Sequence, residues 1–168
     1  MSFVEIEQKY RLKDPAKIRM LLKKMGAKKI SGGLEINEFF DRRGELGGKR
    51  LAMRLRQFSG KATLTLKGPR LASRFTKRME IEAPVDYRSL KTILELAGFK
   101  AVMRYKKERE LYKLGKTIVT VDFLKKFGWF LEIEGEPQSI GKIEKKFCLQ
   151  AKDREERSYL QMLFGWKH

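Results

Sequence analysis

Three Glu-Ile-Glu units, one Arg-Leu-Arg unit and one Lys-Glu-Arg unit of this sequence place like charges two residues apart. The acidic pairs are Glu5 and Glu7, Glu80 and Glu82, and Glu132 and Glu134, and the basic pairs are Arg54 and Arg56, and Lys107 and Arg109. Each pair lies in a segment that alternates charged and apolar residues, as a β-strand does when its two faces differ. Two like charges about 6.6 Å apart repel by about 2.5 kcal/mol at an effective dielectric constant of about 20. The repeated pairing therefore indicates that a group of opposite sign lies between the pairs.

The chemistry of these pairs predicts two kinds of ligand. Paired carboxylates favour a divalent cation that prefers oxygen ligands, Mg²⁺ or Mn²⁺. Paired Arg and Lys side chains favour phosphate oxygens, which a guanidinium binds through two parallel hydrogen bonds. Lys9 and Arg78 lie in the same segments as two of these pairs, and Lys67 and Asp122 lie in further alternating segments. Together these residues predict a container for a metal-bound polyphosphate.

A solvent-exposed sheet face is the simpler interpretation of any single strand, because charged residues usually lie there. A solvated face gains most when opposite signs alternate between neighbours, whereas here like charges are paired on strand after strand. The recurrence therefore favours a shared interior face.

Two amphipathic helices are predicted at corresponding places in the chain. The first has Asp14 as its N-cap and ends at Gly26, and the second has Asp86 as its N-cap and ends at Gly98, 72 residues later. Each helix follows an acidic alternation and precedes an extended segment. The chain therefore contains two pseudo-repeated strand-helix-strand halves.

The remaining segments predict about eight strands, mostly antiparallel, followed by further helix at the C-terminal end. The glycine-rich segment at residues 44–50 lacks the spacing of a phosphate-binding P-loop, and we expect a structural loop there. Antiparallel strands in this number remove their edges by closing into a barrel. We therefore expect an α+β fold, in which a closed antiparallel eight-stranded barrel has a charged lumen and amphipathic helices cover its apolar outer face.

Composition narrows the classes of function. The chain has 168 residues and 42% hydrophobic content, which favours a single domain over residues 1–168. Its one histidine, His168, and one cysteine, Cys148, exclude Ser-His-Asp chemistry, zinc sites built on histidine and an intramolecular disulfide. We find no signal-like N-terminus and no apolar run of about 18 residues, so we expect a cytoplasmic protein that does not enter a membrane.

The net charge of +18 predicts an anionic partner, whether nucleic acid, a phosphorylated metabolite or an acidic lipid. Seven basic and seven acidic residues are candidates for the lumen, so the excess positive charge lies outside it. We expect a small triphosphate-bearing substrate and do not expect nucleic acid as a partner. The sequence leaves open whether the protein forms a homodimer.

Seven segments in order carry a resemblance to a known family. They are EIEQK, RLR, LTLKGP, RMEIE, KKERELY, TVDFL and FLEIEGE, and they span nearly the whole chain. The sequence resembles the CYTH family, also called the triphosphate tunnel metalloenzymes, which includes class IV adenylate cyclases and thiamine triphosphatases. The resemblance is greatest to the class IV cyclases. It implies an eight-stranded antiparallel tunnel that holds a triphosphate and one or two divalent ions.

The resemblance also implies roles for individual residues. The implied metal ligands are Glu5, Glu7, Glu132 and Glu134, with Glu80, Glu82 and Asp122 as further acidic contributors. The implied triphosphate ligands are Lys9, Arg54, Arg56, Lys67 and Arg109, with Lys107, Arg78 and the C-terminal Arg157 as further candidates. We expect Glu5, Glu7, Lys9 and Arg56 to be the catalytic residues.

Three functions are compatible with these residues. The first is an adenylate cyclase that converts ATP to cyclic AMP and pyrophosphate. The second is a triphosphatase that hydrolyses thiamine triphosphate, a nucleoside triphosphate or inorganic triphosphate. The third is a non-enzymatic binder of polyphosphate or RNA. The first two share their phosphate and metal ligands, so the sequence does not separate them.

Overall fold

The computed structural model describes residues 4–165, and Phe3 and His168 therefore lie outside it. These residues form eight strands, five α-helices and a short 3₁₀-helix at Ala151–Asp153. The strands are β1 (Val4–Leu12), β2 (Lys28–Asp41), β3 (Ala52–Phe58), β4 (Lys61–Leu71), β5 (Thr76–Val85), β6 (Lys100–Leu114), β7 (Thr117–Leu124) and β8 (Gly128–Glu134). The helices are α1 (Pro15–Lys24), α2 (Glu45–Gly48), α3 (Tyr87–Leu96), α4 (Pro137–Lys146) and α5 (Tyr159–Phe164).

The strands close into one antiparallel barrel in the order β1-β5-β4-β3-β2-β6-β7-β8. Closure pairs both edges of every strand, so the sheet exposes no edge for unwanted pairing within the described residues. The α+β fold with a closed eight-stranded antiparallel barrel is confirmed.

The predicted pseudo-repeat is visible in the element boundaries. β5, α3 and β6 begin at Thr76, Tyr87 and Lys100, each 72 residues after the start of β1, α1 and β2. Equivalent strands also pair with each other in space, since β1 pairs with β5 and β2 with β6. The two halves are thus joined edge to edge through their corresponding strands.

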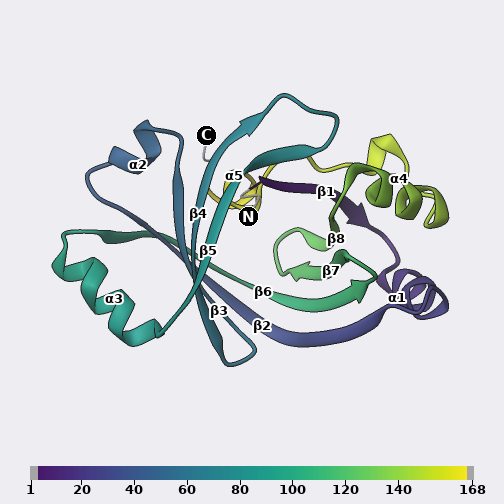
Figure 1. Ribbon diagram of the computed structural model, residues 1–168, viewed down its shortest axis with the longest axis horizontal. Coiled ribbons are helices and arrows are strands. Elements are labelled where there is room, and N and C mark those ends of the chain that lie inside the picture. Colours follow the sequence, from purple (N-terminus) through teal and green to yellow (C-terminus); the bar gives the residue numbers. More distant parts are fainter. Residues whose placement is uncertain (1–3, 166–168) are drawn as a thin grey trace.

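Helices cover two regions of the barrel's outer surface, at opposite ends of the view in Figure 1. At one end α1 and α4 bury Leu22 and Ile140 against apolar residues of β1, β7 and β8. At the other end α3 buries Leu94 against Phe40 and Leu55 of β2 and β3. The apolar outer face therefore packs under amphipathic helices as expected.

The predicted N-caps begin these helices as expected. The side chain of Asp14 accepts a hydrogen bond from the backbone N–H of Lys17, and that of Asp86 accepts one from Ser89. Both bonds satisfy N–H groups that the first helical turn leaves unpaired.

The glycine-rich segment differs from the expectation of a loop, because it contains the short helix α2. The carboxylate of Asp41 accepts hydrogen bonds from the backbone N–H groups of Leu46 and Gly47, both at 3.0 Å, and so holds the first turn in place. None of the helices within residues 4–165 is long and apolar enough to cross a membrane.

The packing predicts different effects for two leucines of corresponding helices. Leu22 of α1 is fully buried, whereas Leu96 of α3 is 85% exposed. We expect Leu22→Ala to lower the free energy of unfolding by about 3 kcal/mol, because it leaves a cavity, and Leu96→Ala to change it by less than about 0.5 kcal/mol. Urea denaturation of both variants measures the difference. Equal effects would contradict the packing of α1 on the barrel.

Candidate active site in the barrel lumen

A cavity of about 500 Å³ occupies the lumen, a size within the range of small-molecule sites. Nine basic and six acidic side chains line it. The basic residues are Lys9, Arg50, Arg54, Arg56, Lys67, Arg70, Arg78, Lys107 and Arg109, and the acidic ones are Glu5, Glu7, Glu80, Glu82, Glu132 and Glu134. The lining thus carries a surplus of positive charge, which differs from the balance counted in the sequence.

We call Glu5, Glu7, Glu80 and Glu134 the acidic cluster, since they gather where β1, β5 and β8 meet. Arg78 holds the first two: its Nε donates to Glu5 at 2.8 Å and its second amino group to Glu7 at 2.9 Å. The Nζ of Lys67 approaches Glu5 at 3.4 Å. Two cations therefore separate carboxylates that would otherwise repel one another.

Glu134 differs from the other members, because within residues 4–165 no Lys or Arg nitrogen lies within 4.0 Å of its carboxylate. Partial desolvation in the lumen raises the pKa of its carboxylate to about 7, although the residue keeps an exposed part, and the negative charges of Glu5, Glu7 and Glu80 act in the same direction. The acidic cluster thus carries more negative charge than its cations neutralise.

For Glu80 and Glu82 the group of opposite sign that the pairing predicts need not be a bound ligand. Neighbouring strands supply the opposite charge instead: Lys67 pairs with Glu80, and Arg56 lies 3.2 Å from Glu82. Arg54 lies 3.6 Å from Glu80 and 3.3 Å from Glu82. Each carboxylate of this pair therefore lies beside a cation from another strand of the barrel.

We call Arg54, Arg56, Lys107 and Arg109 the basic cluster, from β3 and β6. Arg109 donates to Asp122 at 2.7 and 2.6 Å and to Glu132 at 2.6 Å. Lys107 donates to Asp122 at 2.8 Å and lies 3.5 Å from Glu35.

These contacts keep the basic cluster charged. Burial alone would lower the pKa of Lys107, as does Arg109, but the carboxylates of Asp122, Glu35 and Glu132 outweigh both and the pKa is raised. For Arg56 the direction is opposite, because burial lowers its pKa and the like charge of Arg54 lowers it further. A guanidinium nevertheless keeps its proton. The cluster therefore presents fixed positive charge to the cavity.

Tyr159 of α5 forms part of the cavity wall between the two clusters. Its hydroxyl donates to Asp122 at 2.9 Å, and the Nζ atoms of Lys9 and Lys107 each lie 4.2 Å from the centre of its ring. A capping box at Ser158 starts α5 and so fixes the position of Tyr159. The C-terminal helix thus orients two lysines that come from different strands.

Two of the predicted site residues do not reach the cavity. Asp122 is fully buried behind the wall, where its carboxylate holds Lys107, Arg109 and Tyr159. Arg157 pairs with Glu155, and its side chain is 55% exposed. The other predicted metal and triphosphate ligands all line the lumen.

Several residues that shape the site could not be identified directly from the sequence. Glu35 is fully buried beside Arg109 at 3.3 Å, but its segment resembles ordinary amphipathic strand. Phe39, Tyr105 and Tyr159 also line the cavity. Arg50 and Arg70 were not predicted, because Arg50 precedes β3 and simple alternation from Lys67 along β4 would turn Arg70 outward.

The acidic cluster has the donors that a hard divalent cation needs. Its members supply carboxylate oxygens alone, and Glu134 retains uncompensated negative charge. As they stand, no three acidic side chains of the described residues converge closely enough to hold an ion. Binding would therefore require Glu5 or Glu7 to turn from Arg78 toward the ion.

Comparison with known proteins identifies the family. A model of the CYTH domain matches residues 4–159, so the chain belongs to the CYTH family. A protein of Methanocaldococcus jannaschii named "Putative adenylate cyclase" is 32% identical over 147 residues, which are 85% of this chain and 81% of that protein.

Two solved structures share the fold. One, from Vibrio parahaemolyticus and described as a "putative adenylate cyclase", has a TM-score of 0.85 at 24% identity and covers 97% of this chain and 99% of its own. The other, from Hippeastrum, is described as a "putative adenylyl cyclase" with a dominant triphosphatase activity. It has a TM-score of 0.72 at 21% identity and covers 94% of each chain.

The raised pKa of Glu134 predicts a pH-dependent effect on stability in metal-free buffer. The folded protein binds this proton more tightly than the unfolded chain, so the stabilisation is complete below pH 4.5 and is lost as the pH rises through about 7. We expect Glu134→Gln to be more stable than the wild type at pH 8 and equal to it at pH 4.5. The gain should stay near or below about 1 kcal/mol, because Glu134 is exposed enough for solvent to screen it.

Urea denaturation at the two pH values measures this difference. Glu108→Gln is the matched control, since Glu108 is exposed on β6 and does not line the cavity. A stability difference for Glu134→Gln that does not change with pH would contradict the raised pKa.

Proposed function

We propose that this protein is a metal-dependent enzyme that acts on triphosphate-bearing substrates, and that its reaction is that of a class IV adenylate cyclase, from ATP to cyclic AMP and pyrophosphate. The observation that carries the proposal is the lumen, where a basic cluster and an acidic cluster line one cavity of about 500 Å³. The family and the relative from Methanocaldococcus jannaschii support it.

The basic residues bind and orient the triphosphate in this proposal. Arg54, Arg56 and Arg109 offer planar guanidinium groups that match phosphate oxygens, and Lys9 and Lys67 add point charges. Arg78 and Lys107 line the same cavity as further ligands. Because carboxylates hold most of these cations in place before substrate binds, little reorganisation is needed to stabilise charge that develops on the phosphate.

The acidic cluster would hold Mg²⁺ or Mn²⁺ through Glu5, Glu7 and Glu134, with Glu80, Glu82 and Glu132 nearby. A bound divalent ion would neutralise phosphate charge and lower the pKa of an attacking hydroxyl. In a cyclase that hydroxyl is the 3′-OH of the ribose, which attacks the α-phosphorus while the bond to the pyrophosphate oxygen breaks. Lys9 and Arg56 line the same cavity and would stabilise the transition-state charge.

A triphosphatase is the second candidate, and the relative from Hippeastrum is the observation that favours it. The same cations would bind the triphosphate, but water would attack a terminal phosphorus. A non-enzymatic binder of polyphosphate or RNA fits less well, because the surplus of positive charge in the site lies inside a closed barrel. The cytoplasmic location and the homodimer stay predictions.

The products distinguish the candidates. We expect the protein to convert ATP to cyclic AMP and pyrophosphate in the presence of Mg²⁺ or Mn²⁺, and to lose this activity in EDTA because the acidic cluster then lacks its ion. Chromatography that resolves cyclic AMP from ADP and ATP measures the outcome. Formation of ADP and phosphate alone would establish the triphosphatase, and full turnover in EDTA would contradict the metal requirement.

Two variants test the proposed catalytic residues. We expect Glu7→Ala and Arg56→Ala each to lower kcat at least about 100-fold, since Glu7 would hold the metal ion and Arg56 would stabilise the negative charge of the transition state. Lys106→Ala is the matched control, because Lys106 neighbours Lys107 on β6 but is exposed and does not line the cavity. Normal turnover by folded Glu7→Ala and Arg56→Ala would exclude the lumen as the active site.

A further inference from the structure

A β-bulge in β4 reverses the direction in which its side chains point. Lys67 lies opposite Glu80 of β5, and both line the cavity. Three residues later Arg70 lies opposite Arg78, only two residues before Glu80, so β4 contains one extra residue between the two pairs. Simple alternation from Lys67 would turn Pro69 inward and Arg70 outward. The extra residue instead turns Arg70 into the lumen.

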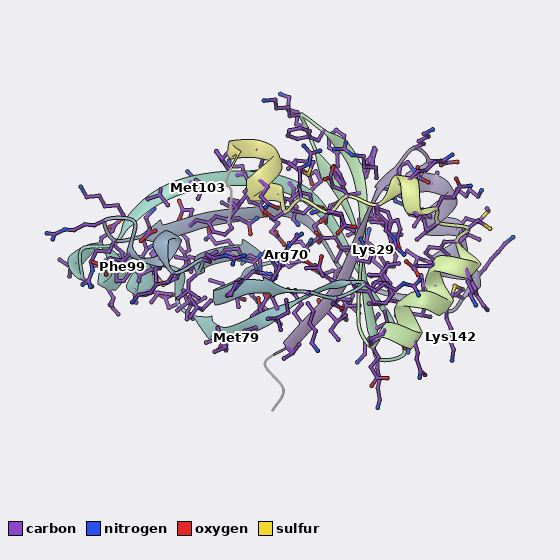
Figure 2. The ribbon with its side chains drawn as sticks, turned by 90° about the horizontal axis from the view of Figure 1, so that it is seen from above. Lys29, Arg70, Met79, Phe99, Met103 and Lys142 are labelled. Atoms are coloured by element: carbon purple, nitrogen blue, oxygen red, sulfur yellow. The ribbon has the colours of Figure 1, made fainter. Side chains whose placement is uncertain are left out.

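The local sequence explains why the bulge forms at this place. A Cβ atom on Gly68 would lie 3.3 Å from the Cβ of Met79, so a larger residue would crowd the approach of the two strands. Pro69 has no N–H to give to the ladder, and proline is confined in sheets to edges, strand ends and bulges. Figure 2 shows the result: Arg70 lies in the middle of the molecule, whereas Met79 lies at its lower edge.

Arg70 differs from the other cations of the lumen in its partners. Within the described residues, seven of the nine basic side chains that line the cavity lie within 4.0 Å of a carboxylate oxygen. Arg50 and Arg70 are the two that do not, and of these Arg50 is exposed while Arg70 is half-buried. Arg70 donates instead to a neutral group, the backbone carbonyl of Glu156.

The surroundings of Arg70 compensate its charge only in part. Burial lowers its pKa, and the like charge of Arg78 directly opposite lowers it further, while the more distant carboxylates of Glu7, Glu156 and Glu5 act against both without outweighing them. Arg78 already donates to Glu5 and Glu7. Since a guanidinium keeps its proton, an anion is the group that can relieve this repulsion.

We propose that Arg70 is a phosphate-binding residue of the lumen, which the β4 bulge aims at the end of the triphosphate next to the acidic cluster, beside Arg78. The inference rests on the proposed function, because it assigns one more ligand to the same triphosphate. The free amino group of Arg70 that does not reach Glu156 would donate to phosphate oxygens, as in bidentate recognition of phosphate by arginine.

If the role of Arg70 were purely structural, its hydrogen bond to Glu156 would only hold the C-terminal segment against β4. Arg70→Lys separates the two roles, since a lysine can still donate to one carbonyl but cannot bind phosphate with a planar fork. Lys77→Gln is the matched control for charge, because Lys77 lies opposite Leu71 on the same strand pair and does not line the cavity.

The test is calorimetric titration of inorganic tripolyphosphate into the wild type, Arg70→Gln, Arg70→Lys and Lys77→Gln, all in Mg²⁺, with melting temperatures measured in parallel. We expect Arg70→Gln to weaken binding at least about tenfold, the usual effect of losing a hydrogen bond to a charged group. Arg70→Lys should lie between Arg70→Gln and the wild type, and Lys77→Gln should stay within about twofold of the wild type.

The outcomes separate this inference from the proposed function. If the wild type binds tripolyphosphate and Arg70→Gln binds it equally well, the role of Arg70 is overturned while the function stands. Equal weakening by Arg70→Gln and Lys77→Gln would also overturn it, because the effect would then be one of net charge. If the wild type itself does not bind tripolyphosphate, both the inference and the proposed function are overturned.

Discussion

Charge enclosed in a closed barrel is the constraint on which the rest of this structure depends. Removing a charged side chain from water costs several kcal/mol unless a well-placed partner compensates it. In this lumen the partners come from neighbouring strands: Asp122 holds Lys107 and Arg109 at 2.6–2.8 Å, and Arg78 holds Glu5 and Glu7. The register of the strands therefore fixes the electrostatics of the cavity, because a slip by one residue would exchange its charged face for an apolar one.

Compensation is incomplete at two neighbouring places, and these suggest what the cavity binds. Glu134 keeps a carboxylate that nearby cations do not neutralise, and Arg70 keeps a guanidinium that nearby carboxylates do not. Apart from the exposed Arg50, the other charged side chains that line the cavity pair with one another and so form a frame around these two. A divalent ion beside a phosphate group would satisfy both at once, which is why we interpret the lumen as one site for both ligands.

Much of the frame could be predicted from the sequence, because it follows from local rules. Alternation with a period of two identified the inward residues of most strands, and N-caps at Asp14 and Asp86 located the repeated helices. The predictions that failed concern residues whose positions depend on pairing between distant segments. Asp122 has the right alternation but lies behind the wall, and Arg70 faces inward only because of the β4 bulge. Tyr159 reaches the lumen through the docking of α5, which no local pattern reveals.

The central claim is that the acidic and basic clusters form a single site, and the coupling between metal and triphosphate tests it most directly. If one cavity holds both ligands, each must tighten the binding of the other by the same factor. Calorimetric titration of tripolyphosphate into the wild-type protein with and without Mg²⁺ measures that factor. We predict binding at least about tenfold tighter with Mg²⁺, because the ternary complex alone neutralises both clusters, within the usual range of such couplings. Equal affinities in the two titrations would show that the clusters act independently and would contradict the account.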